Sequence, residues 1–397
     1  MTSWPMTTLG EVCKFVRGPF GGSLKKDSFV EKGFAVYEQQ HAIYDQFEDI
    51  RYFIDEVKFK EMQRFELHPN ELIMSCSGTM GRVAIVPTGI QRGIINQALL
   101  KLSPSAAIFP KFLKYWMDSS DFQDSLKEQA GGAAIQNVAS VSILKTIKIQ
   151  HPSLHEQQRI VAILDEAFDG IATVKANAEK NLQNARALFD SHLQSVFSQR
   201  GEGWAKKRLE QIGTTQTGTT PKTAEKSNYG DFIPFVKPAD FNKDGSLDYE
   251  NDGLSEQGLK DARSVAAGSV LMVCIGATIG KCGYSDRRVT TNQQINAFTP
   301  SKGVSHKFVY FQMLTEGFQR SVMHSSAQAT LPIINKSKWS ALTLVLPLSI
   351  DEQDRIVAKF DALAGKTQRL ESIYQQKLAA LDELKKSLLH QAFSGEL

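Results

Sequence analysis

The feature that most constrains this chain is an internal repeat. The ten residues that begin at Glu156 recur from Glu352, with seven of the ten positions identical and a spacing of 196 residues. Further matching pairs, at spacings of 196 to 200 residues, are Phe197-Ser198 with Phe393-Ser394, Asn96-Gln97 with Asn292-Gln293, Cys76 with Cys274, Gly18 with Gly218, and Trp4 with Trp204. A chain of 397 residues is therefore predicted to consist of two similar halves, whose insertions and deletions are confined to their fronts.

Each half ends in a segment that is typical of a long helix. Ser153-x-x-Glu156 and Ser349-x-x-Glu352 are capping boxes. Apolar residues then follow in steps of three and four, the period of a coiled-coil seam. The predicted seam positions are Ile160, Leu164, Ala167, Ile171, Val174, Ala178, Ala185 and Leu188, and in the second half Ile356, Phe360, Leu363, Leu370, Tyr374, Leu381, Leu384 and Leu388.

We expect long helices over residues 152–201 and 348–397, each spanning roughly 60 Å at about 1.5 Å per residue. Helices of equal length are expected to pair with each other. Such a pair could simply build a core, but its repetition after two similar segments favours a spacer that holds two domains apart.

The segments before the helices, residues 1–151 and 202–347, are predicted to be two similar globular domains. Short β-branched and apolar runs at 82–87, 269–275 and 341–346 are typical of strands, and residues 112–126 and 307–318 favour helix. The predicted fold class is α+β, with two similar domains separated by two long antiparallel coiled-coil helices and related by an internal pseudo-two-fold repeat.

Composition excludes several classes of protein and leaves nucleic-acid binding open. The 46 Lys and Arg residues nearly balance 43 Asp and Glu, for a formal net charge of +3, so any basic surface must be local. The four cysteines form no C-x-x-C pair, which argues against a disulfide framework and a structural zinc site. No signal peptide or membrane-spanning stretch is evident, and we expect a cytoplasmic protein.

No arrangement of residues predicts catalysis or a metal site. Gly276 to Lys281 resembles a phosphate-binding P-loop, but three residues rather than four separate its glycines, and Cys282 replaces the hydroxyl residue. His155-Glu156 begins a pattern like H-E-x-x-H, but Arg159 holds the second ligand position and has no lone pair for a metal. No carboxylate–lysine cluster of a nuclease is evident either, so the chain is expected to be non-catalytic.

Side chains suited to DNA contact occur at matching places in both halves. Basic and hydroxyl residues contact phosphates, while Asn and Gln can bond adenine and Arg can bond guanine. The predicted DNA-binding residues are Arg17, Lys25, Lys26, Gln39, Gln40, Thr79, Arg82, Asn96 and Gln97 in the first half, and Thr219, Lys222, Lys237, Thr278, Lys281, Asn292 and Gln293 in the second. The repeated Asn-Gln element could equally be a structural hydrogen-bonding pair.

In this order and repetition, the motifs resemble the DNA specificity subunits of type I restriction–modification systems over the whole chain. The markers are Trp4 to Leu9 and Trp204 to Leu209, Gly218-x-Thr220-Pro221, the Cys76-x-Gly78 and Cys274-x-Gly276 turns, and Glu-Gln-x-Arg-Ile at both helix starts. The first half departs from the pattern, with Gly18-Pro19-Phe20-Gly21 in place of Gly-x-Thr-Pro.

The resemblance implies a subunit without catalysis or a cofactor of its own. Each domain would be a target recognition domain that reads one half of a split, asymmetric site in double-stranded DNA. The helices would set the spacing and dock two methyltransferase subunits, which carry S-adenosylmethionine. Motor-nuclease subunits, where present, would let the complex cleave unmodified DNA.

Apolar residues beside the helix seam are predicted to bind the partner subunits, unless the two domains fold back over them. The predicted partner-binding residues are Phe168, Phe189, Phe197 and Phe393. Two other classes of function stay open at this point. One is a coiled-coil scaffold whose domains bind proteins, and the other is a stand-alone endonuclease with a split site.

Overall fold

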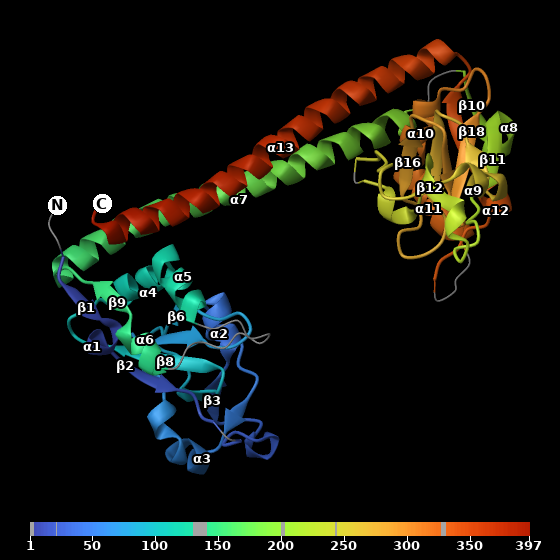
Figure 1. Ribbon diagram of the computed structural model, residues 1–397. Helices are drawn as coiled ribbons and strands as arrows, with labels where there is room; N and C mark the ends of the chain where they lie inside the picture. The colour runs from blue at the N-terminus through green and yellow to red at the C-terminus, as the bar shows by residue number, and fades with distance from the viewer. Residues whose placement is uncertain (1–3, 21, 130–140, 200–202, 243, 327–330) are drawn as a thin grey trace. The chain divides into compact units, whose positions relative to one another are not determined.

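The computed structural model describes residues 4–20, 22–129, 141–199, 203–242, 244–326 and 331–397. The chain forms two compact units, Met1–Glu179 with Gln376–Leu397 and Lys180–Gln375. Each unit combines one α+β head with parts of two 45-residue helices, α7 (Leu154–Ser198) and α13 (Ile350–Ser394), labelled in Figure 1. The unit boundaries therefore fall inside the long helices rather than at the ends of the heads.

The described residues of the first head form three small sheets. An antiparallel sheet has the order β2 (Cys13–Arg17), β8 (Leu99–Pro104), β5 (Leu72–Ser75), β6 (Val83–Ile85). A mixed sheet has the order β4 (Phe53–Ile54), β3 (Phe34–Tyr37), β7 (Gly93–Ile95), and β1 (Met6–Thr8) pairs with β9 (Lys148–Gln150). The helices are α1 (Leu9–Val12), α2 (Gln39–Tyr44), α3 (Glu56–Glu61), α4 (Pro110–Asp118), α5 (Ser120–Gln129) and α6 (Val141–Thr146), with 3-10 turns at Lys26–Ser28 and Gln63–Phe65.

The second head repeats this topology with one strand added. Its antiparallel sheet is β11 (Gly213–Thr217), β18 (Ile295–Pro300), β15 (Ser269–Val273), β16 (Cys282–Ser285), and β10 (Trp204–Arg208) pairs with β19 (Thr343–Pro347). The mixed sheet is β13 (Gly253–Leu254), β12 (Tyr229–Val236), β17 (Val289–Thr291), β14 (Ser264–Val265), with β14 as an added edge strand. The helices are α8 (Leu209–Ile212), α9 (Glu256–Asp261), α10 (His306–Met313), α11 (Glu316–Ser325) and α12 (Lys336–Ser340), with 3-10 turns at Lys226–Asn228 and Pro238–Asp240. The duplication seen in the sequence is thus a duplication of fold.

The long helices contribute directly to the core of each head. In the first unit, Ile160 and Leu164 of α7 and Ala392 of α13 are buried in the same cluster as Phe112 of α4. In the second unit, Phe360 of α13 occupies the corresponding cluster. Burying this apolar surface stabilises each head only when its helices are present.

The four phenylalanines predicted to bind partners all pack within these units, and their contact with a partner stays a prediction. Phe393 is buried and packs edge-on against Phe112, with ring centroids 5.2 Å apart. Phe168 packs edge-on against Tyr115, and Lys385 Nζ lies 4.9 Å from the centroid of the Phe168 ring. Phe189 and Phe197 both contact the ring of Phe360. These aromatic side chains attach the helices to the heads.

A buried glutamine fastens the start of each long helix to its head. The Gln157 side chain accepts a hydrogen bond from the Phe109 backbone N–H at 2.7 Å and donates to the carbonyls of Pro152 and Ala107, at 2.9 and 3.1 Å. Gln353 accepts from the Ser305 N–H at 2.8 Å and donates to Pro347 and Gly303, at 2.8 and 3.4 Å. Both side chains are fully buried. The glutamine of the repeated Glu-Gln-x-Arg-Ile motif therefore encodes this junction.

Aspartates about two turns further along reinforce the two junctions. Asp165 accepts hydrogen bonds from Lys111 Nζ at 2.7 Å and from the Tyr115 hydroxyl at 2.5 Å. Asp361 accepts from Lys307 Nζ at 2.8 Å. Each head therefore has an equivalent lysine–aspartate contact with its own long helix, and the first head adds a tyrosine.

Within each unit α7 and α13 run antiparallel. In the first unit Lys175 Nζ lies 2.9 Å from Asp382 Oδ1, and in the second Arg186 Nε lies 3.0 Å from Glu371 Oε2. Arg159 also contacts Leu397 in the first unit, and Phe197 contacts Phe360 in the second, so within each unit the residue number rises along α7 as it falls along α13. Both bridges are largely exposed, so each is expected to contribute at most about 1 kcal/mol.

The predicted seam is correct at some positions and wrong at others. Ile160, Leu164, Ala178, Ala185 and Phe360 are buried. Three seam predictions are overturned, because Leu188, Leu370 and Leu384 are 55%, 39% and 47% exposed. The strict heptad reading fails there because part of the apolar face of these helices is left uncovered.

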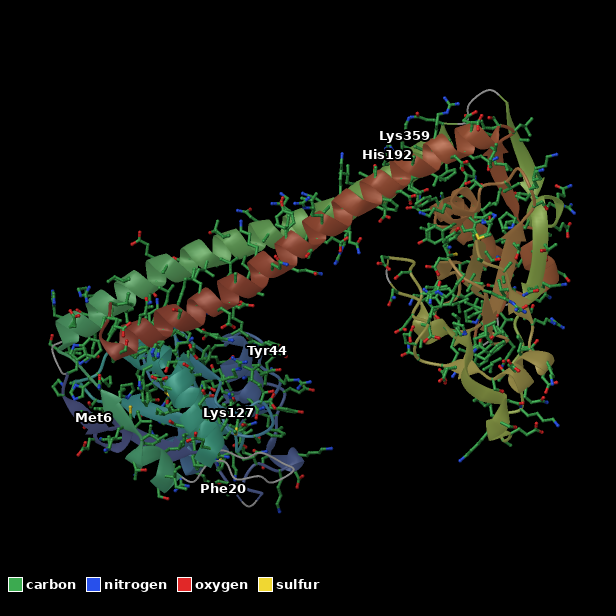
Figure 2. All side chains as sticks on the ribbon, turned by 45° about the horizontal axis from the view of Figure 1, so that its top comes forward. Met6, Phe20, Tyr44, Lys127, His192 and Lys359 are labelled. Carbon is green, nitrogen blue, oxygen red and sulfur yellow. The ribbon has the colours of Figure 1, made fainter. Side chains whose placement is uncertain are left out.

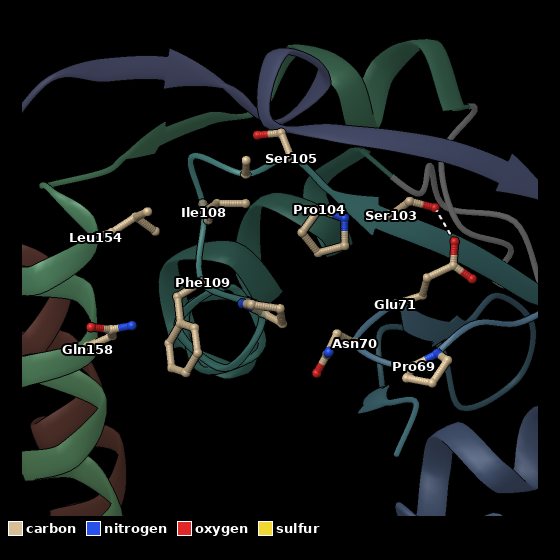
Figure 3. A pocket seen from close by; sticks show the side chains of 12 residues that line it. Pro69, Asn70, Glu71, Ser103, Pro104, Ser105, Ile108, Phe109, Leu154 and Gln158 are labelled. Carbon is tan, nitrogen blue, oxygen red and sulfur yellow. Dashed lines mark hydrogen bonds between the residues drawn. The ribbon is translucent and has the colours of Figure 1, made fainter. Parts of the chain in front are cut away.

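A cleft of about 390 Å³ lies in the first unit where β8 ends and α7 begins (Figure 3). Pro104 and Phe109 lie on the side of the head, and Leu154 and Gln158 on the side of the helix. Glu71 is the one ionisable residue that lines it, and its carboxylate already accepts a hydrogen bond from Ser103 and pairs with Lys101 at 3.4 Å. This cleft has no constellation of groups suited to catalysis.

No helix in the described parts of the chain has the length and apolar character needed to cross a membrane.

We predict that Gln157→Ala lowers the free energy of unfolding by about 2 kcal/mol, because it leaves a buried N–H and two carbonyls without partners. Urea denaturation of the full chain measures the loss. The matched control is Gln158→Ala, because Gln158 is its exposed neighbour and should change stability little. Equal effects of the two substitutions would show that the junction does not depend on this amide.

Candidate DNA interface

The ends of four strands meet at one edge of the first head. In the antiparallel sheet Arg17 at the end of β2 pairs with Leu100, and Ser75 at the end of β5 pairs with Leu99. In the mixed sheet β3 and β7 run parallel and end together at Tyr37 and Ile95. The loops that follow these strands must therefore lie at this edge, which we call the loop edge.

The second head has an equivalent loop edge. Thr217 at the end of β11 pairs with Asn296, and Val273 at the end of β15 pairs with Ile295. The parallel strands β12 and β17 end at Val236 and Thr291. Most of the predicted DNA-binding residues follow these strands, so the topology gathers segments that are far apart in the sequence.

A glycine turn after β5 and β15 is fastened to each head by another glutamine. Gln123 Nε2 donates to the Gly81 carbonyl at 2.9 Å, and Gln319 Nε2 donates to the Gly280 carbonyl at 2.9 Å. Gly280 has a φ of 89°, and a Cβ there would lie 2.2 Å from the Gln319 side chain, so only glycine fits. The segment that resembles a P-loop is therefore a structural turn.

The Asn-Gln element forms a second turn that supports the loop after β2 and β11. Asn96 Oδ1 accepts from the Ala98 N–H and Asn292 Oδ1 from the Gln294 N–H, both at 3.0 Å. Gly18 packs so tightly on this turn that a Cβ would lie 1.8 Å from the Asn96 carbonyl oxygen. The Asn-Gln element was predicted either to contact DNA or to form structural hydrogen bonds. Its two asparagines form structural hydrogen bonds.

Most residues predicted in the first head lie at its loop edge and are accessible. Lys25, Lys26, Thr79, Arg82 and Gln97 are exposed, and Arg17, Gln39, Gln40 and Asn96 are half-buried. Gln39 accepts a hydrogen bond from Ser77 at 3.1 Å, and Gln40 donates to the Asp49 carbonyl at 3.1 Å. Arg17, Lys25, Lys26 and Arg82 form no ion pair within the described residues, so the segments after these strands carry four positive charges without an ion-pair partner.

The residues predicted in the second head divide into accessible and structural ones. Lys222, Thr278 and Gln293 are exposed and Thr219 is half-buried, although Lys222 also pairs with Glu225 at 3.4 Å. Three of the other predicted side chains also have partners within the fold, and their contact with DNA stays a prediction. Asn292 is buried with its amide bonded to Gln294, Lys237 pairs with Asp252 at 2.7 Å, and Lys281 donates to the Phe241 carbonyl. These three side chains are already used by the fold.

The sequence analysis missed one prominent side chain at the first loop edge. Phe20 follows β2 and is 67% exposed, and the Arg17 guanidinium lies 5.8 Å from the centre of its ring. The sequence signal that could have identified Phe20 is that Gly18-Pro19-Phe20-Gly21 differs from the Gly-x-Thr-Pro pattern of the second half.

The buried cysteines are anchors rather than nucleophiles. The Cys76 N–H donates to the Ala98 carbonyl at 2.9 Å and the Cys274 N–H to the Gln294 carbonyl at 2.7 Å, which ties the two turns of each loop edge together. Burial raises the pKa of both thiols to about 12, so they are protonated at neutral pH. The described residues contain no group of three or more His, Cys, Asp or Glu side chains that could hold a metal ion.

The fold and its loop edges define a class of protein. It is a binding protein with two heads, whose sheets are arranged alike and whose loops differ in sequence. The comparison with known families identifies it further. Residues 1–183 and 201–379 each match the family described as type I restriction modification DNA specificity domain. The chain belongs to this family, and it holds two copies of the domain.

Individual relatives agree with this assignment. The chain is 28% identical over 202 residues to the type I restriction enzyme HindI specificity subunit of Haemophilus influenzae, an alignment covering 49% of this chain and 42% of that protein. It is 22% identical over 351 residues to the MjaIX specificity subunit of Methanocaldococcus jannaschii, covering 82% of this chain and 77% of that one. The first alignment thus spans less than half the length of its relative.

Two solved structures share the fold. A chain from a structure that addresses assembly and conformational transition of the type I R-M system matches with a TM-score of 0.81 and 18% identity, covering 100% of this chain and 99% of that chain. The HsdS subunit from Thermoanaerobacter tengcongensis matches with a TM-score of 0.62 and 19% identity, covering 100% and 98%.

We predict that the free energy of unfolding falls as the pH rises above about 8.5, the ordinary pKa of an unfolded thiol. Cys13, Cys76 and Cys274 have a folded pKa of about 12, so the unfolded chain loses these protons first and the folded state loses stability until about pH 12. Urea denaturation at pH 7.5 and pH 10 measures the decline. A Cys76→Ala, Cys274→Ala variant should show a shallower decline, and an unchanged decline would contradict this origin.

Proposed function

We propose that the chain is the DNA-reading subunit of a type I restriction–modification complex and that it recognises a bipartite, asymmetric site in double-stranded DNA. The observation that carries the proposal is the duplicated loop edge, which offers two separate reading surfaces on one chain. A scaffold with protein-binding heads, or a stand-alone split-site endonuclease, does not account for family membership over both halves.

The two half-sites differ because the two loop edges differ. The loop after β2 has Pro19 and Phe20, whereas the equivalent loop after β11 has Thr219 and Thr220. The second head also has the added strand β14 beside β17. Direct readout depends on the side chains that enter a groove, so loops of different chemistry read different bases.

Catalysis in this proposal belongs to the partner subunits. Methyltransferase subunits bind S-adenosylmethionine and methylate adenine, and motor-nuclease subunits cleave unmodified DNA. This chain holds no cofactor and supplies position and sequence choice. We place the complex in the cytoplasm, where bacterial and archaeal DNA is found.

Exposed leucines on the long helices support docking of two methyltransferase subunits. Leu188 of α7 and Leu384 of α13 lie 196 residues apart, at equivalent positions of the repeat, and are 55% and 47% exposed. In the second unit Leu370 and Ile373, 39% and 49% exposed, flank Glu371, which is bonded to Arg186 close to Leu188. Repeated exposed apolar side chains on each unit favour two copies of one partner.

The proposed function predicts a split adenine-methylation motif in the DNA of cells that express the chain with its methyltransferase. Long-read methylation sequencing detects it, and cells that lack this chain are the control. Exchanging residues 202–347 for those of a related subunit should change one half of the motif only. A stable complex without any such motif would favour the protein-binding scaffold, and cleavage by the chain alone with Mg²⁺ would favour the endonuclease.

We predict that Leu188→Glu and Leu384→Glu each remove one of the two methyltransferase subunits, because each places a charge in an apolar contact. The mass of the purified complex, measured by light scattering, gives the number of subunits bound. Val57→Glu is the matched control, since Val57 is 69% exposed on α3 of the first head. Full assembly of the double variant would place the docking surface elsewhere.

A further inference from the structure

Phe20 is an exposed aromatic side chain that is not part of the hydrophobic core of the first head. It follows β2 at the loop edge and belongs to neither hydrophobic cluster of the first head, with 67% of its surface exposed. Figure 2 labels it on the first unit. Large apolar side chains exposed at a functional edge commonly mark a contact with a ligand.

The backbone before Phe20 is held in place, and the Phe20 carbonyl accepts a hydrogen bond from further along the loop. The Gly18 N–H donates to the Leu99 carbonyl at 2.9 Å, and Gly18 is packed against the Asn96 carbonyl. Pro19 is buried, and the Ser23 hydroxyl donates to the Phe20 carbonyl at 2.7 Å. The loop therefore presents the ring at a defined place.

The charges around Phe20 fit DNA rather than a protein partner with an apolar surface. Arg17 lies 5.8 Å from the ring centroid, and Lys25 and Lys26 are exposed nearby in the sequence without ion pairs in the described part of the chain. Cationic side chains that flank an apolar one suit a ligand with phosphates around a less polar centre. In the major groove, the apolar group on the base edges is the C5-methyl of thymine.

The second head lacks this feature. The position equivalent to Phe20, at the spacing of 200 residues that holds in this part of the repeat, is Thr220. Its hydroxyl donates a hydrogen bond to the Gln293 side chain, so the loop is polar and tied to the amide turn. The two loop edges therefore differ at this point in exposed apolar surface.

We propose that Phe20 packs against the C5-methyl group of one thymine in the half-site read by the first head and so determines the base preferred there. This inference rests on the proposed function, and it names a residue that selects a base. Arg17, Lys25 and Lys26 hold the flanking phosphates, while the apolar ring favours thymine over the other pyrimidine, which has no methyl group.

The test uses the assembled specificity–methyltransferase complex and duplexes that carry its methylation motif. Each thymine of the first half-site is replaced in turn by deoxyuridine, which lacks only the C5-methyl. At one position the wild-type complex should bind about fourfold more weakly, the equivalent of one buried methyl group. Phe20→Ala should bind the two duplexes equally, and its preference in the second half-site should be unchanged.

Val57→Ala is the matched control, because it truncates an exposed apolar side chain on α3, away from the loop edge. It should distinguish thymine from deoxyuridine as the wild type does. If Phe20→Ala still distinguishes them at every position that the wild type does, or if the wild type distinguishes them nowhere, the role of Phe20 is overturned. A wild-type complex without a split motif would overturn the proposed function itself.

Discussion

Both units depend on the side-chain amide of a glutamine buried at the start of each long helix. Gln157 and Gln353 satisfy backbone groups of the segment that follows the main sheet and of the proline before the helix. Because an unpaired buried amide or carbonyl is costly, each helix can leave its head in one orientation only. The aromatic contacts of Phe393 and Phe360 act on the same junction from the apolar side.

This junction and the loop edge lie at opposite ends of one strand. In the first head, β8 begins beside the loops at Leu99 and ends at Pro104, next to the cleft and the start of α7 (Figure 3). The four-stranded sheet therefore separates the part that fixes the helices from the loop edge that we propose contacts DNA. Loops at one end can diverge without disturbing the other, as the contrast between Phe20 and Thr220 illustrates.

The sequence was sufficient for the large features, because repetition and helix caps are local or periodic signals. The helices expected over 152–201 and 348–397 occur as Leu154–Ser198 and Ile350–Ser394, and the strand expected at 269–275 occurs as β15. Burial could not be predicted in the same way. Phe393 and Leu188 both look apolar and helical in sequence, yet one is buried and the other is exposed, because packing against the heads decides this. Likewise the sequence indicates that the Asn292 amide is suited to hydrogen bonding with a base, but it does not show that this amide is bonded within its own turn.

The seam between the long helices shows that the two halves have diverged in a coordinated way. Lys175 and Glu371 are equivalent positions of the repeat, and so are Arg186 and Asp382. The two ion pairs are thus the same contact with the signs reversed. Pairing α7 with α13 brings opposite charges together at both places, whereas pairing either helix with a copy of itself in the same register would oppose like charges. The two halves of the chain therefore differ in their long helices as well as in their loop edges. The opposite charges at these positions favour pairing of α7 with α13 over pairing of either helix with a copy of itself.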